Sequence, residues 1–139
     1  MTREIKFRGK RLNNGEWIFG DLIENQGRFF IYHATSETTI EDSEDGRISI
    51  VAVEVDPATI GEYTGLKDKN GRDIYEGDIM EIPETDFNAY IVGTVEYQED
   101  NFFIQSRNGG SPWGLQWSLR KHNAGILGII HDNPELLKK

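Results

Sequence analysis

The sequence contains no cysteine and no long apolar run. The lack of cysteine excludes disulfides, thiolate zinc sites and a thiol nucleophile, and it is compatible with a reducing cytoplasm. No stretch approaches the ~18 apolar residues that a membrane-spanning helix needs. At the N-terminus Ile5 and Phe7 alternate with charged residues, so we see no signal peptide. We therefore expect a protein of the cytoplasm that does not enter a membrane.

Catalytic and metal-binding patterns are also scarce. The three histidines, His33, His122 and His131, lie far apart and in no recognised ligand spacing, and no G-x-S-x-G motif occurs. The segment 42–46 (DSEDG) is superficially similar to a calcium loop, but its glycine is fifth and Val53 stands where the final glutamate belongs. We interpret it as a solvated acidic loop. The sequence predicts no metal, no cofactor and no enzyme activity.

The net charge of −9 opposes binding to a phosphate backbone. Basic residues nevertheless crowd residues 3–11, where Lys6, Arg8 and Lys10 would share one face of a strand. Together with nearby aromatic residues they form a candidate anion or nucleic-acid contact. An edge strand kept polar to discourage aggregation explains the same residues. The aromatic residues in question are Trp17, Phe19, Phe29 and Phe30.

Turn residues punctuate short apolar runs along the whole chain. Three Asn-Gly pairs occur, and no long segment shows a period near 3.6, so a mainly β fold such as a small barrel or sandwich is favoured. Gly20 suggests a bulge or a bend in its strand. Residues 34–47 are predicted to form an exposed loop, and residues 83–89 a polar loop. Asp56 and Asn133, each followed by proline, are expected to cap short helical turns, while 113–119 is ambiguous. The predicted strands are a hairpin over 5–24 and then 28–33, 48–55, 79–82, 90–97, 102–105 and 124–131.

The stretch 59–82 holds the densest turn chemistry. Gly71, Gly77 and Asp78 are predicted to hold the backbone in tight turns. Asp73, Glu76 and Asp78, with Tyr75 nearby, could instead form a carboxylate site for acid–base chemistry. Ordinary turn chemistry is the preferred interpretation. The segment 70–80 (NGRDIYEGDIM) also echoes 14–23 (NGEWIFGDLI), with one extra residue.

The chain resembles the YopX family of small phage and prophage proteins. The segments that carry the resemblance run in family order and span nearly the whole chain. They are IKFRGK at 5–10, WIFGDLI at 17–23, VDPATIGEYTGLKDKNGRDIYEGDI at 55–79, GTVEY at 93–97 and GIIHDNPELL at 128–137. The resemblance implies one YopX-like unit over 1–139, with an N-terminal β region at 1–58 and a small SH3-like barrel at 59–139. It implies a phage or prophage gene and no established catalytic residues.

Three functions follow as hypotheses. The first is a non-enzymatic protein-interaction module of the bacterial host cytoplasm, with Trp113, Trp117, Tyr90 and Phe102 as its candidate interaction surface. The alternative is nucleic-acid association through residues 3–11, and the least favoured is an enzyme with a carboxylate site. Exposed edge strands also allow homo-oligomerisation.

Overall fold

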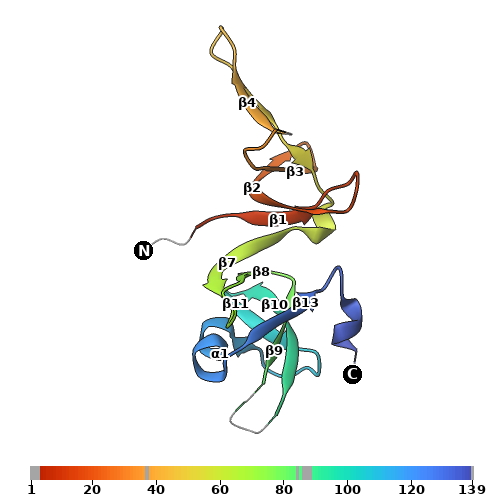
Figure 1. Ribbon diagram of the computed structural model, residues 1–139, viewed down its shortest axis with the longest axis vertical. Helices are drawn as coiled ribbons and strands as arrows, with labels where there is room; N and C mark the ends of the chain where they lie inside the picture. The colour runs from red at the N-terminus through yellow and green to blue at the C-terminus, as the bar shows by residue number, and fades with distance from the viewer. Residues whose placement is uncertain (1–3, 37, 84, 86–88, 139) are drawn as a thin grey trace. The chain divides into compact units, whose positions relative to one another are not determined.

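The computed structural model describes residues 4–36, 38–83, 85 and 89–138. Arg3 and part of the predicted loop 83–89 therefore lie outside the described residues. The chain is mainly β and divides into two compact units, Met1–Glu62 and Tyr63–Lys139 (Figure 1). The sequence placed its subdivision at 58/59. In the described part of the chain, no helix has both the length and the apolar character needed to cross a membrane.

The first unit is an antiparallel sheet of strands in the order β6-β3-β2-β1, followed by the beginning of β7. The predicted hairpin over 5–24 is confirmed by the pairing of β1 with β2. Its turn is closed by three bonds of 2.9 Å: Arg11 N–H to the Glu16 carbonyl, Gly15 N–H to the Arg11 carbonyl, and Glu16 N–H to Asn14 Oδ1. The strands are β1 (Phe7–Lys10), β2 (Trp17–Asn25), β3 (Arg28–Tyr32), β6 (Val53–Glu54) and β7 (Gly61–Lys67).

Gly20 marks a close approach of two backbones. It is the last residue of β2 that pairs with β1, opposite Phe7, and the pairing of β2 with β3 begins at Asp21. A Cβ at this position would lie 2.2 Å from the carbonyl oxygen of Tyr32, and the φ of +156° is one that side chains rarely allow. The sequence suggested a bulge or a bend at this position. The β1–β2 and β2–β3 registers show no shift, and the glycine permits a backbone contact instead of a bulge.

The segment 34–47, predicted as a loop, contains a strand. β4 (Thr39–Asp42) pairs with β5 (Ile48–Val51) in a separate two-stranded hairpin. Its turn is closed by the Ser43 N–H bond to the Arg47 carbonyl at 2.8 Å. The strand predicted over 48–55 includes β5, but β4 was missed because all four of its residues are exposed and Ile40 is its one apolar side chain, so it shows no apolar–polar alternation.

A short 3-10 helix, η1 (Pro57–Thr59), follows as expected from Asp56-Pro57. The Ala58 N–H donates to Asp56 Oδ1 at 3.0 Å, and Pro57 occupies the first turn. The predicted cap is confirmed.

The second unit is built around a sheet in the order β12-β11-β10-β9-β13. The helix α1 (Leu115–His122) connects β12 to β13, and the remainder of β7 pairs with β8 (Asp73–Tyr75). Among the described residues no pairing joins β12 to β13, so the sheet is not closed into a barrel. The sheet strands are β9 (Asp78–Ile82), β10 (Ile91–Gln98), β11 (Asn101–Ser106), β12 (Trp113–Gly114) and β13 (Gly125–Ile129).

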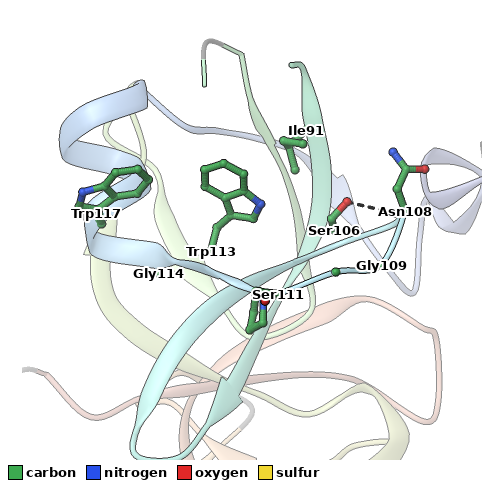
Figure 2. A pocket seen from close by; sticks show the side chains of 10 residues that line it. Ile91, Ser106, Asn108, Gly109, Ser111, Trp113, Gly114 and Trp117 are labelled. Atoms are coloured by element: carbon green, nitrogen blue, oxygen red, sulfur yellow. Dashed lines mark hydrogen bonds between the residues drawn. The ribbon is translucent and has the colours of Figure 1, made fainter. Parts of the chain in front are cut away.

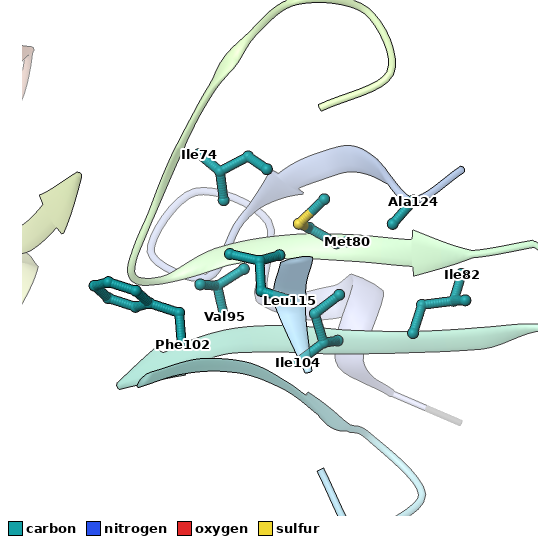
Figure 3. Close-up of a cluster of buried hydrophobic side chains, with 8 residues drawn as sticks. All are labelled: Ile74, Met80, Ile82, Val95, Phe102, Ile104, Leu115 and Ala124. Carbon is teal, nitrogen blue, oxygen red and sulfur yellow. The ribbon is translucent and has the colours of Figure 1, made fainter. Parts of the chain in front are cut away.

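The core of this unit is a cluster of buried apolar side chains from its strands, from α1 and from the short connection between α1 and β13 (Figure 3). The predicted pairing of 102–105 with 90–97 is confirmed, and it places Phe102 and Ile104 on the buried face of β11. The cluster is Ile74, Met80, Ile82, Val95, Phe102, Ile104, Leu115 and Ala124.

The short helical turn expected after Asn133 is confirmed as the 3-10 helix η2 (Pro134–Leu137), with Asn133 at its N-cap position, but the Asn133 side chain makes no capping hydrogen bond. Its Oδ1 instead accepts the Ile129 N–H at 3.1 Å, just where β13 ends. The prediction considered only local donors, and an amide of the preceding strand is the one that the side chain reaches.

A buried carboxylate, Asp68, ties the β7–β8 turn to β13. Its Oδ1 accepts the N–H groups of Asn70 and Arg72 at 2.9 and 3.0 Å. Its Oδ2 accepts the Ile126 N–H at 3.0 Å and the Arg72 guanidinium at 3.1 and 3.2 Å. Burial alone would raise the pKa of Asp68, but these donors and the charge of Arg72 outweigh it and hold the pKa below its usual range.

Candidate functional site

The second unit carries a groove of about 570 Å³ with two tryptophans on its wall (Figure 2). We call it the tryptophan groove. It is bounded by β10 and β11, by the loop that follows β11, and by the start of α1. Its lining residues are Ile91, Ser106, Asn108, Gly109, Gly110, Ser111, Pro112, Trp113, Gly114 and Trp117.

The loop over 107–112 is held in place by bonds to β11. The amides of Asn108 and Gly109 donate to the Oγ and carbonyl of Ser106, at 3.1 and 3.0 Å. The Gln105 side-chain amide donates to the Gly110 carbonyl at 3.2 Å. This loop is therefore a defined rim, and a ligand that contacts it need not order it first.

The two indoles stack because of their positions in the chain. Trp113 ends the sheet in β12, and Trp117 lies four residues later in the first turn of α1. Their ring centroids are 6.0 Å apart with an interplanar angle of 27°. The imidazole of His122 meets Trp117 edge-on at 4.7 Å and Trp113 at 6.3 Å. Trp117 remains 44% exposed and offers an apolar face that is already fixed in orientation.

Acidic side chains are absent from the lining of the groove. They are absent from the whole of residues 101–131, although the chain carries a net charge of −9. A second hollow of about 300 Å³ adjoins Trp117 and is lined by Gln116, Arg120 and Lys121 as well. The surface around Trp117 thus combines aromatic area with cations from α1.

The four predicted surface aromatics do not stay together. Trp113 and Trp117 line the groove, and Tyr90 directly precedes the lining residue Ile91. Phe102 is only 5% exposed and packs in the core, with its ring 5.0 Å from that of Tyr97. Phe102 is therefore corrected from an interaction residue to a core residue.

Tyr90 is exposed but anchored. Its hydroxyl donates to Glu81 Oε1 at 2.9 Å, and Lys69 Nζ donates to Oε2 at 3.1 Å. Burial alone would raise the pKa of Glu81, but these two donors reverse the effect and lower it. Burial and the bond to the carboxylate raise the pKa of Tyr90.

The predicted basic face at the N-terminus is not presented as an open anion site. Arg8 is 4% exposed, and its guanidinium carbon lies 4.9 Å from the ring centroid of Trp17. Lys10 Nζ lies over the same ring at 5.5 Å, and Lys6 is 3.5 Å from Glu4. Arg8 and Lys10 thus lie over the ring of Trp17, one of the four aromatic residues expected to stack on a base, and their contact with it is one of packing.

Asp73 and Asp78, two of the three carboxylates of the candidate acid–base site, make separate structural contacts. Asp78 is buried, and its Oδ2 accepts the Tyr75 N–H at 2.8 Å. Asp73 pairs with Lys67 at 2.6 Å. Gly71 and Gly77 adopt φ of +80° and +90° in the turns before β8 and β9.

The echo between 14–23 and 70–80 yields two different structures. Gly20-Asp21 continues the strand β2, whereas Glu76-Gly77 forms a turn between β8 and β9.

Among the described residues, no group of three or more His, Asp or Glu side chains is placed to hold a metal ion.

These features define a mainly β chain with an aromatic groove in its second unit. Residues 6–138 match the model of the YopX protein family, and the chain belongs to that family. Among solved structures it is similar to the crystal structure of protein EF1440 from Enterococcus faecalis, with a TM-score of 0.64 and 24% identity. That likeness covers 99% of this chain and 100% of the other, and it concerns the fold. No curated protein matches the sequence.

The sequence predicted only part of the groove. It identified Trp113 and Trp117 as interaction residues, but not the glycine-containing rim over 107–112 or the acid-free stretch 101–131. Both signals can be read directly from the residues. What could not be read is that Ile91, from a distant strand, completes the wall.

Proposed function

We propose that this chain is a non-enzymatic protein-interaction module that binds a protein partner through the tryptophan groove. The observation that carries the proposal is Trp117, which is stacked on Trp113 and still 44% exposed beside the groove. Aromatic side chains held rigidly at a surface give large contact area at low entropic cost, and they dominate many binding interfaces.

We further propose that the second unit is an open variant of a small SH3-like barrel, and its topology supports this. The meander β9-β10-β11-β12 is followed by α1, and β13 returns to pair with β9. Small barrels of this kind bind through loops and grooves lined with aromatic residues. The groove, formed by the loop 107–112 and the start of α1, has that character.

The family resemblance supports a phage or prophage gene, with the protein acting in the cytoplasm of the bacterial host. A chain without cysteine has no disulfide that a reducing compartment would break. The partner would then be a protein of the phage or of its host.

A comparative capture experiment tests the interaction. The wild-type chain, Trp117→Ala and the control Leu127→Ala are each immobilised and exposed to lysate of a host that carries the phage. Leu127, 39% exposed on β13, matches Trp117 as an exposed apolar side chain outside the groove. We expect specific proteins that wild type and Leu127→Ala retain and Trp117→Ala loses. Equal recovery by all three, or none by any, would overturn the proposal.

A further inference from the structure

The β4–β5 hairpin carries an exposed apolar face that the fold of its own unit does not use. The register pairs Ile40 with Ile50 and Asp42 with Ile48. Residues directly opposite in an antiparallel pair point to the same side, so the three isoleucines share one face. All three are at least half exposed, and Figure 1 shows the hairpin extending from the strands of the first unit.

Such a feature needs an explanation. A lone two-stranded hairpin is marginally stable in water, and exposed apolar patches on soluble proteins mark interaction sites. The other face of the hairpin bears Thr39, Glu41, Ser49 and Val51. Three of the four apolar side chains of the hairpin thus lie on one side, with Asp42 beside them, and Val51 lies on the other.

The charge of the hairpin restricts what that partner is. Glu41 and Asp42 lie in β4, and Glu44 and Asp45 lie in the turn. Arg47 is the basic residue of this segment, and it pairs with Asp45 at 3.1 Å. Two such hairpins would repel each other, so contact between identical faces is disfavoured. An apolar surface flanked by cations and free of acids suits this face better.

The tryptophan groove has that chemistry within the same chain. Its lining has apolar indoles and no acid, and Arg120 and Lys121 flank Trp117. We infer that the Ile40–Ile48–Ile50 face of one copy docks on the tryptophan groove of a second copy. The contact would bury the isoleucines against the indoles and place the acidic turn near the cations of α1. This inference rests on the proposed role of the groove as a docking surface.

A complementation experiment tests the pairing. Sedimentation velocity on the full chain, over a wide concentration range, should show reversible self-association that weakens as salt screens the charges. Ile50→Ser and Trp117→Ala should each weaken association about tenfold or more. Val51→Ser is the matched control, because Val51 is 49% exposed beside Ile50 at 50% but lies on the opposite face. It should associate like wild type.

Mixing the two weakened variants is decisive. Ile50→Ser retains an intact groove and Trp117→Ala retains an intact hairpin, so the mixture should associate more strongly than either variant alone. A monomeric wild type at every concentration would overturn the inference, as would a mixture no stronger than its parts. If the wild type is monomeric but the capture experiment still depends on Trp117, this inference fails and the proposed function stands. If neither behaviour depends on Trp117, both fail.

Discussion

Replacing Asp68 by asparagine removes a single negative charge from a buried carboxylate of the second unit that accepts several hydrogen bonds. The amide keeps Oδ1, which still accepts from the N–H groups of Asn70 and Arg72. In place of Oδ2 it presents an NH₂ group, a donor, to the Ile126 N–H and the Arg72 guanidinium. Donor would then face donor at a fully buried position.

The cost follows from these two losses. A buried N–H left without an acceptor costs about 1–3 kcal/mol. The Arg72 side chain is about half exposed, so losing its partner adds only about 0–1 kcal/mol. We expect Asp68→Asn to lower the free energy of unfolding by ~3 kcal/mol, which corresponds to a fall in Tm of about 10 °C for a chain of this size.

Chemical denaturation monitored by tryptophan fluorescence measures this loss, with Asp42→Asn on the exposed strand β4 as a control for the change in charge. The folded-state pKa of Asp68 is depressed, so its stabilisation is present above the unfolded-state pKa and is lost as the pH falls through the folded-state value. The gap between wild type and variant should therefore be constant above about pH 5 and shrink below about pH 4. A loss under ~1 kcal/mol at neutral pH, or a gap that persists in acid, would refute the reasoning.

Three further changes test other parts of the second unit. Tyr90→Phe removes a hydrogen-bond donor to Glu81, so the pKa of Glu81 measured by NMR should rise, and an unchanged pKa would contradict the contact. Because the pKa of Glu81 is depressed in the folded wild type, the small loss of stability in the variant should fade as the pH falls through that pKa. Gly93→Ala places a Cβ 2.4 Å from the carbonyl oxygen of Gln105 in β11 and should lower the free energy of unfolding, measured in urea, by at least about 2 kcal/mol. Gly114→Ala is the control: its Cβ would make an ordinary contact at 3.8 Å, so its stability should be close to that of wild type. Phe102→Ala should cost about 3–5 kcal/mol as a core truncation, and a loss below ~1 kcal/mol would return Phe102 to the surface.

Two predictions that depended on neighbours in the sequence were confirmed. The hairpin around Asn14-Gly15 and the cap at Asp56 use donors and acceptors within a few residues, so the sequence specifies them locally. The side-chain cap predicted at Asn133 does not form, because its partner lies outside the helix start. Asn133 Oδ1 accepts the N–H of Ile129, and the local sequence pattern of a helix start does not include that residue.

The candidate site shows the same division. Trp117 and Phe102 are both large aromatics, and residue type alone assigned both to the surface. The alternation of Phe102, Ile104 and Ser106 along β11 places all three on the buried face, and this period of two was available in the sequence. The position of Ile91 on the groove wall was not available, because it depends on the pairing of β10 with β11.

Net charge proved a poor guide to where this protein could bind. A value of −9 argues for solubility and against a phosphate backbone, but it averages over regions of opposite character. The acids concentrate in segments such as the β4–β5 hairpin, while residues 101–131 contain none and hold Arg107, Arg120 and Lys121. Screening in water confines most electrostatic recognition to about 10 Å, so a partner senses the local charge of the surface that it touches. The tryptophan groove is therefore expected to select an acidic, apolar partner, although the chain as a whole is acidic.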